Sequence, residues 1–277
     1  MAPKADSCVT LFGAGGGPVT SSKVVHFILR CAALCAKKRK ASPGPLNIVS
    51  INTAKDKVAT FYEHFVWLNK FFAGPNFKLS LLHEFNEQPK RRDVEKKLAE
   101  ADLIVFPGGD TELATELLEK WGLARPIRRA VERGVVVFGH SAGLLIWFGA
   151  AQTDAESYKN EKRGAKDDPF NYKVIRTLGV LKTSAVCAPH SSDNAQEWTK
   201  MDYSAGNTRG DVHADWIRCT GAPGLNVPAD TAIYTNDDVV TVLGTDQVST
   251  YRWDKDQLIT DHFKSGERFS LSTLERL

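Results

Sequence analysis

The chain lacks long apolar runs, and this absence limits the cellular locations that we expect for it. Nothing in its 277 residues approaches the 18 consecutive apolar residues of a membrane-spanning helix. The N-terminus, MAPKADSCVTLF, has no apolar core of the length found in a signal peptide. We therefore expect a cytoplasmic protein with no membrane partner.

Cysteine is scarce and the net charge is small. Five cysteines, an odd number without a paired pattern, favour reduced thiols. Cys31 and Cys35 lie four residues apart on a predicted helical face, and no second pair with zinc spacing follows, so we expect them to pack. The net charge of +3 is too slight to indicate a nucleic-acid partner. The basic run at residues 37–40 closes a helical stretch, where cations suit the negative end of the helix dipole.

The sequence does contain short apolar runs that alternate with segments of helical length. Strands are expected at residues 8–13, 46–52, 77–85, 101–108, 135–139 and 183–190, and helices at residues 22–38, 56–72, 92–101, 112–122, 126–134 and 144–151. Such alternation predicts βαβ units and a mostly parallel sheet sandwiched by helices. After Pro228 the pattern changes to short runs with turn signals between them, which predicts antiparallel strands near the C-terminus. We expect one α/β domain over residues 1–277.

Two polar residues interrupt the apolar run over residues 135–151. His140 and Ser141 stand between Gly139 and Gly143 in the sequence GHSAG, directly after a predicted buried strand. A strand that meets G-x-S-x-G and continues as a helix is typical of a nucleophile elbow, a sharp turn that exposes the serine hydroxyl. Glycines fit such a turn because it leaves no room for Cβ atoms. A turn without a catalytic role is the alternative.

Further polar segments follow most of the other expected strands. GAGGG follows the first strand, TAKD the second, PGGDT the fourth, GHSAG the fifth and APHSSDN the sixth. In an open α/β sheet, ligands bind outside the carboxyl ends of the strands, so these segments should share one edge. GAGGG matches neither of the two common phosphate-binding motifs, and no metal or organic cofactor is expected.

A serine hydroxyl needs a neighbouring base to take its proton, and histidine is the usual one. Of the seven histidines, His190 ends an apolar strand and opens a polar loop, so we expect it to be the base. His140 adjoins the serine, and because adjacent elbow residues diverge, we expect it to line the substrate-binding site. His64 falls inside a helical pattern, which favours a structural role with its hydrogen bonds satisfied.

Acyl transfer also needs donors aimed at the developing oxyanion. The backbone N–H of Ala142, directly after Ser141, should be one donor. Paired glycines in PGGDT let the backbone approach a ligand closely, so the Gly109 amide is the best candidate for the second donor, with Asp110 next. The alternative is a plain strand-to-helix turn capped by Asp110 or Thr111.

Four segments carry a resemblance to a known family. ADLIVFPGGDT, RGVVVFGHSAG, APH and GNTRGD occur in the order seen in the aspartyl dipeptidase (peptidase E) and cyanophycinase family of serine peptidases. The similarity covers about residues 9–244. It implies an α/β fold related to class I glutamine amidotransferases, with Ser141 as nucleophile, His190 as base and an oxyanion hole from Gly109 and Ala142.

The resemblance also implies a substrate-binding arginine and a triad acid. Arg209, in GNTR, takes the position expected to bind the substrate's aspartyl side chain, and a guanidinium offers a fixed bidentate fork to a carboxylate. The family's triad glutamate would fall at Ala229. Asp230, one residue on, and Glu156, fifteen residues after the nucleophile, are the two candidate replacements.

Taken together, the sequence predicts a serine peptidase that hydrolyses small peptides through an acyl-enzyme on Ser141, and dipeptides with an N-terminal aspartate are the expected substrates. Two alternatives stay open. An esterase of the α/β-hydrolase type would use a histidine near the C-terminus, and His262 is the only candidate there. A degenerate relative would bind a ligand without catalysis, as Ala229 allows. The related fold often pairs, which leaves a homodimer open.

Overall fold

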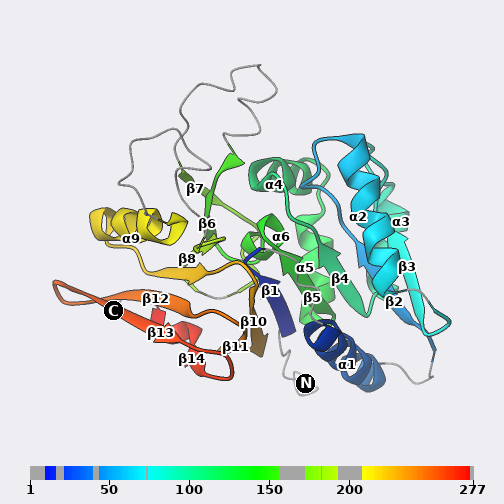
Figure 1. The fold of residues 1–277 in the computed structure, drawn as a ribbon. Coiled ribbons are helices and arrows are strands. Elements are labelled where there is room, and N and C mark those ends of the chain that lie inside the picture. The colour runs from blue at the N-terminus through cyan, green and yellow to red at the C-terminus, as the bar shows by residue number, and fades with distance from the viewer. Residues whose placement is uncertain are drawn as a thin grey trace, which may run out of the picture.

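The computed structural model describes residues 10–16, 22–39, 44–72, 74–155, 172–181, 183–192, 208–236 and 238–274. In these residues the chain forms two β-sheets, and helices flank the larger one (Figure 1). Within the described ranges, no helix combines the length and the apolar character needed to cross a bilayer.

The larger sheet has a parallel half and an antiparallel half. Its order is β14-β11-β10-β1-β5-β4-β2-β3. The parallel strands are β1 (Thr10–Ala14), β5 (Val136–His140), β4 (Leu103–Phe106), β2 (Leu46–Ser50) and β3 (Phe77–Leu81). The antiparallel strands are β10 (Thr231–Asn236), β11 (Val239–Gly244) and β14 (Arg268–Ser270). The parallel strands begin and end close to the predicted positions, and the C-terminal strands are antiparallel as expected.

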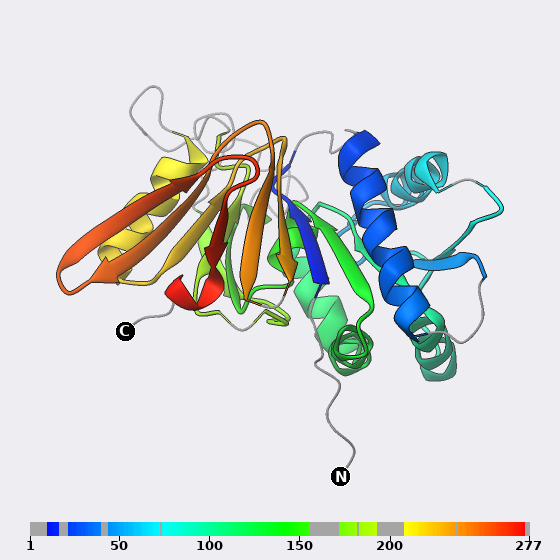
Figure 2. The ribbon, with the colours of Figure 1, turned by 90° about the horizontal axis from the view of Figure 1, so that it is seen from below.

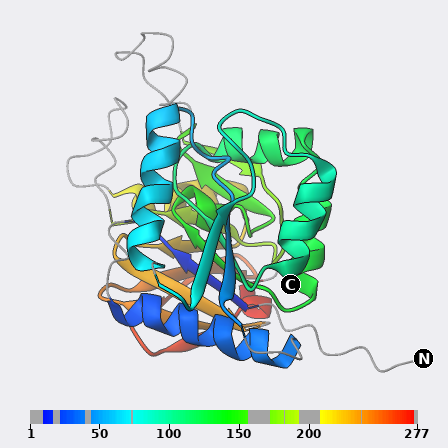
Figure 3. The ribbon, with the colours of Figure 1, turned by 90° about the vertical axis from the view of Figure 1, so that its right-hand side faces the viewer.

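Helices cover both faces of the parallel half (Figure 3). α1 (Ser22–Arg39) and α2 (Val58–Phe71) lie on one face, and α3 (Arg91–Glu100), α4 (Thr111–Lys120) and α5 (Ala124–Glu132) lie on the other. Along β4, Leu103 faces the α1 side and Ile104 the α3 side, and both are fully buried. A strand covered on both faces needs apolar residues at every position, which explains the unbroken apolar runs. Cys31 and Cys35 pack against the core on the α1 side, as predicted.

The smaller sheet lies beside the antiparallel half of the larger one (Figure 2). Its order is β13-β12-β9-β8-β6-β7, formed by β13 (Gln257–Phe263), β12 (Val248–Asp254), β9 (Gly224–Val227), β8 (Val186–Pro189), β6 (Ala150–Thr153) and β7 (Lys173–Arg176). α9 (Arg209–Thr220) packs on it, and the short 3-10 helix η1 (Leu271–Leu274) follows β14. Sequence patterning did not predict a second sheet, because strand periodicity is the same whichever sheet a strand joins.

The helix predicted over residues 144–151 is wrong. α6 covers only Ala142–Leu145, and β6 begins at Ala150. The carbonyl of Trp147 accepts hydrogen bonds from the amides of Val180 (2.9 Å) and Leu181 (2.9 Å) instead of from the next helical turn. Trp147 is fully buried, so the apolar run reflects a core crossing between the two sheets rather than a long helix.

Gly13 and Leu144 show how closely α6 packs on β1. A Cβ atom built on Gly13 would lie 2.0 Å from Leu144 Cδ1, so the leucine side chain occupies the space that the glycine leaves. Leu144 is fully buried. The two residues form a complementary pair that presses the first turn after Ser141 onto the sheet.

Substitutions at Gly13 and Leu144 should therefore compensate each other. Leu144→Ala leaves a cavity and should lower the free energy of unfolding by about 2–5 kcal/mol. Gly13→Ala forces a methyl group against Leu144 and should also destabilise. The loss of unfolding free energy in the double variant should be smaller than the sum of the two single losses by at least about 1 kcal/mol. Urea unfolding of wild type and the three variants measures these losses. Strict additivity would contradict this packing.

Candidate active site

Ser141 lies in a sharp turn between β5 and α6. Its backbone has φ 54° and ψ −115°, a conformation that residues other than glycine rarely adopt. Such a conformation costs on the order of 1–3 kcal/mol and persists only where the surroundings impose it. The Ser141 N–H donates to the carbonyl of Ala14 at 2.8 Å, which ties the turn to the end of β1. The sharp turn predicted at Ser141 is therefore present.

The two glycines of GHSAG are required by close backbone approach. A Cβ atom on Gly139 would lie 2.1 Å from the carbonyl oxygen of Gly143. A Cβ atom on Gly143 would lie 2.3 Å from the carbonyl oxygen of Phe106 at the end of β4. Any side chain at either position would push the turn away from the sheet, so the motif follows from packing.

His190 follows β8 and reaches Ser141 from the smaller sheet. Its Nε2 lies 2.9 Å from Ser141 Oγ, within hydrogen-bond distance. The His190 N–H donates to the carbonyl of Gly15 at 2.9 Å. A Cβ atom on Gly16 would lie 2.1 Å from His190 Cε1, so the imidazole rests against the bare backbone of the GAGGG segment. The structure thus brings together the two residues expected to be nucleophile and base.

The PGGDT segment after β4 lies directly beside the elbow. A Cβ atom on Gly108 would lie 3.0 Å from Ser141 Cβ and 3.0 Å from His140 Nδ1. Gly109 has φ 141°, and a Cβ atom there would lie 2.2 Å from the Ala54 carbonyl oxygen. Among the described residues, no acceptor is bonded to the backbone N–H of Gly109 or of Ala142. Both amides belong to segments that meet at the serine.

The oxyanion role predicted for Asp110 is wrong. Its backbone N–H donates to the carbonyl of Ala54 at 2.9 Å and cannot also turn to a substrate. Its side chain caps α4 and accepts from the amides of Glu112 (2.9 Å) and Leu113 (3.0 Å). Asp110 therefore fixes the start of α4, which is the alternative that the sequence left open for it.

The triad acid is not found at Asp230. This residue lies in the turn between β9 and β10, with φ 57°, and its N–H donates to the carbonyl of Gly16 at 3.0 Å. Its exposed carboxylate forms no hydrogen bond or ion pair with any residue that the structure describes. Gly16, whose carbonyl accepts the hydrogen bond from the Asp230 N–H, also lies against the His190 ring. The other candidate, Glu156, lies outside the described residues.

Arg209 begins α9 instead of lying in a polar loop. Thr208 and Asp211 form a capping box at the start of this helix. The Arg209 side chain is only 3% exposed, and its Nη1 lies 3.3 Å from Asp154 Oδ2. The guanidinium carbon lies 5.0 Å from the centre of the Tyr172 ring. Sequence patterning missed both the burial and the partners, because they come from distant segments.

A cationic group near the elbow was also missed. Lys55 belongs to the TAKD segment after β2, and its ammonium forms no hydrogen bond or ion pair within the described part of the chain. Burial lowers the pKa of Lys55, although Asp56 and Glu63 act in the opposite direction. An unpaired, half-buried ammonium beside a candidate site is a natural partner for an anionic ligand.

His64 in α2 lies close to this lysine. Burial, reinforced by the charges of Lys55 and His140, lowers the pKa of His64 to about 3, so the imidazole is neutral at pH 7. Its Nε2 is buried without a hydrogen-bond partner among the described residues, which contradicts the expectation of a satisfied structural histidine. The ring stacks on Trp67, with 5.5 Å between ring centres. Lys55, His64 and His140 therefore surround one side of the elbow.

The histidine required by the esterase alternative lies elsewhere. His262 belongs to β13, and its Nδ1 lies 2.9 Å from Ser249 Oγ in the neighbouring strand β12. It does not contact Ser141, whose imidazole partner is His190. In the described ranges, no cluster of three or more metal-ligating side chains occurs.

The chain is similar in sequence to known peptidases and to subunits of another enzyme. The model of peptidase family S51 matches residues 47–243. The uncharacterized peptidase YgaJ of Bacillus subtilis (strain 168) is 38% identical over 68 residues, covering 24% of this chain and 30% of YgaJ. The pyridoxal 5'-phosphate synthase subunit PdxT of Saccharopolyspora erythraea is 29% identical over 131 residues, covering 47% of this chain and 53% of PdxT. The match spans about a third to a half of these relatives' lengths.

A solved structure shares the fold over nearly the whole chain. The crystal structure of a peptidase from an acI-B1 Actinobacterium superposes with a TM-score of 0.66 at 16% identity, covering 95% of this chain and 98% of that one. At this level of identity the likeness bears on the fold alone. It confirms the predicted mostly parallel sheet between helices, followed by antiparallel strands.

The contact between Gly16 and His190 yields a test of the site. Gly16→Ala would place a methyl group within 2.1–2.6 Å of three ring atoms and should displace the imidazole from Ser141. The rate at which a fluorophosphonate labels Ser141 should fall by about 100-fold, since a shift of about 1 Å has this effect on reacting groups. Gly44→Ala is the matched control, because a Cβ atom there meets nothing within 4 Å. An unchanged labelling rate in Gly16→Ala would contradict the geometry.

A second test separates the two candidate triad acids. Asn tolerates positive φ, so Asp230→Asn should keep the fold and leave the labelling rate within about threefold of wild type. Glu156→Gln should lower the rate by about 10³–10⁴-fold if Glu156 orients His190. A large loss in Asp230→Asn alone would restore Asp230 as the acid.

Proposed function

Because the chain belongs to peptidase family S51, we propose that it is a serine peptidase that hydrolyses small peptides, in particular dipeptides with an N-terminal aspartate. The observation that carries the proposal is the hydrogen-bond distance of 2.9 Å between Ser141 Oγ and His190 Nε2. A serine in a strained elbow with an imidazole in reach is suited to nucleophilic attack on an acyl carbon. Four free cysteines in the described residues suit the reducing cytoplasm that we propose as its location.

The reaction proceeds through an acyl-enzyme. Ser141 Oγ attacks the carbonyl carbon of the peptide bond while its proton passes to His190 Nε2. The C–N bond then breaks, and the leaving amine takes the proton from His190. A water molecule attacks the ester, gives its proton to His190, and releases the acid product as the proton returns to Ser141.

The backbone N–H groups of Gly109 and Ala142 stabilise the tetrahedral intermediate. Negative charge develops on the former carbonyl oxygen, and two preorganised donors offset it without reorganisation. Gly108 packs against the Ser141 side chain, which brings the Gly109 segment to the elbow. Loss of one such donor typically lowers kcat by about 10²–10³-fold.

Two cations divide the recognition of an acidic dipeptide between them. Arg209 binds the side-chain carboxylate of the N-terminal aspartate, as the family resemblance implies, because a guanidinium offers a fixed bidentate fork to a carboxylate. Lys55, whose ammonium has no partner among the described residues, binds the C-terminal carboxylate of the leaving residue. Binding both ends limits the substrate to two residues. His140 lines the pocket between them.

Hydrolysis of Asp-Leu beside Ala-Leu and Glu-Leu tests the activity. Wild type should release leucine mainly from Asp-Leu, and Ser141→Ala should abolish release while leaving the thermal unfolding temperature close to that of wild type. Chromatographic detection of free leucine provides the measurement. If folded wild type neither cleaves any dipeptide nor reacts with a fluorophosphonate, the chain is a binding protein that has lost its triad.

The two recognition contacts are tested by matched substrates. Arg209→Gln should lower kcat/KM for Asp-Leu by roughly 10–100-fold and leave the slow turnover of Ala-Leu almost unchanged, since a charge-assisted hydrogen bond is worth about 1.5–3 kcal/mol. Lys55→Gln should lower kcat/KM for Asp-Leu by a similar factor. It should leave kcat/KM for Asp-Leu amide unchanged, because the amide lacks the C-terminal charge. Equal losses on the acid and the amide would exclude the role proposed for Lys55.

A further inference from the structure

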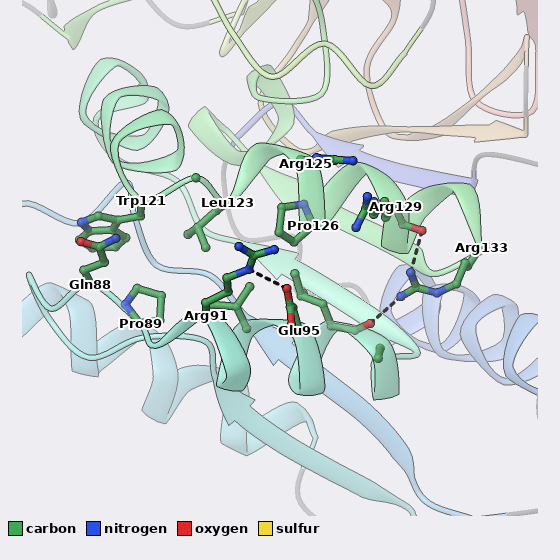
Figure 4. A pocket seen from close by; sticks show the side chains of 14 residues that line it. Gln88, Pro89, Arg91, Glu95, Trp121, Leu123, Arg125, Pro126, Arg129 and Arg133 are labelled. Atoms are coloured by element: carbon green, nitrogen blue, oxygen red, sulfur yellow. Dashed lines mark hydrogen bonds and ion pairs between the residues drawn. The ribbon is translucent and has the colours of Figure 1, made fainter.

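A groove of about 720 Å³ lies between α3 and α5, apart from the candidate active site. Figure 4 shows Arg125 and Arg129 on α5 and Arg133 directly after its end, with Arg91 and Glu95 on α3. None of the residues that line it belongs to the elbow or to the segments that meet there. The groove therefore needs an explanation separate from peptide hydrolysis.

The charge of the groove is strongly one-sided. Four arginines and one glutamate line it, which gives a formal charge of +3, equal to the formal net charge of the whole chain. Arg91 pairs with Glu95 at 2.8 Å across a solvent-exposed turn. Arg133 donates to the carbonyls of Arg129 and Leu98, both at 3.1 Å, and so joins the ends of the two helices. These two arginines have structural roles.

Arg125 and Arg129 have no such role. Neither guanidinium forms an ion pair or a hydrogen bond with another residue in the described part of the chain. Arg125 lies in the first turn of α5, which has no acidic residue and no capping side chain. A cation at the positive end of a helix dipole is unfavourable by about 0.3–1 kcal/mol, and like charges four residues apart add to this. A bound anion would offset both effects.

The floor of the groove is apolar. Pro89 and Pro126 are half-buried and present apolar surface to the groove. Trp121, half-buried, closes one end. An inorganic anion would gain nothing from such a floor, whereas a ligand with both apolar and acidic groups would use the floor and the rim.

The spacing of the arginines suits a helical ligand. Residues 125, 129 and 133 lie four apart, so their Cβ atoms follow a row with about 6 Å between neighbours. Carboxylates four residues apart on an amphipathic helix have the same spacing, and leucines beside them would face the floor. We propose that the groove binds an acidic amphipathic helix of a partner protein, with its carboxylates on Arg125 and Arg129 and its apolar face on the floor.

A designed peptide tests the proposal. The probe is an end-blocked, fluorescein-labelled helix of roughly 14 residues, with glutamate at every fourth position and leucine before each glutamate. Fluorescence anisotropy at low salt should show binding to wild type and at least about tenfold weaker binding to Arg125→Gln/Arg129→Gln. The matched control, Arg92→Gln/Arg176→Gln, removes the same charge from exposed positions outside the groove and should bind within about twofold of wild type.

Five results would overturn the proposal. The first is no binding to wild type at about 1 mM peptide, and the second is an equal loss in the control variant. The third is full displacement by tripolyphosphate at a lower concentration than by unlabelled peptide, which would assign the groove to small polyanions. The fourth is self-association of wild type that Arg125→Gln/Arg129→Gln abolishes, which would make a second copy the occupant. Equal binding of a peptide with glutamine for glutamate would likewise exclude charge recognition.

Discussion

Three consecutive carbonyl groups at the end of β1 hold the site together. The carbonyl of Ala14 accepts from Ser141, that of Gly15 from His190 and that of Gly16 from Asp230, at 2.8, 2.9 and 3.0 Å. All three donors have positive φ, at 54°, 52° and 57°, which is rare for residues with side chains. A strained backbone conformation persists only where several contacts hold it in place. Residues 14–16 supply one such contact to each of the three donor residues. The candidate nucleophile and base thus owe their relative position to β1.

This arrangement explains why the site lies between two sheets. Ser141 ends β5 of the larger sheet, and His190 follows β8 of the smaller one. Glycines at 15 and 16 allow the contact, because a Cβ atom on Gly15 would lie 2.2 Å from the carbonyl oxygens of Val227 and Pro228, and one on Gly16 would enter the imidazole ring. Gly15 and Gly16 allow close packing between the end of β1 and His190, and this accounts for the glycines without a phosphate-binding role.

Positively charged side chains occur at both places where we propose that carboxylates bind. At the site, the ammonium of Lys55 has no partner among the described residues and Arg209 is buried beside Asp154. In the groove between α3 and α5, the guanidinium groups of Arg125 and Arg129 form no ion pair or hydrogen bond in the described structure, and apolar side chains lie beside them. The first pair is largely withdrawn from solvent, whereas the second is exposed. This difference is why we propose a small acidic substrate for the first pair and an extended acidic partner for the second.

Local patterns in the sequence determined the strands and helices of the parallel half and the sharp turn at Ser141, and they singled out His190 as the candidate base. Each depends on short-range features, such as apolar runs, paired glycines and a histidine at a strand end. Only the tertiary structure decided the length of α6, because the amides that bond Trp147 come from residues 180 and 181. It also decided the role of Asp110, whose amide is taken by Ala54, and the burial of Arg209 beside Asp154. Contacts between segments far apart in the chain leave no periodicity behind, so patterning cannot detect them.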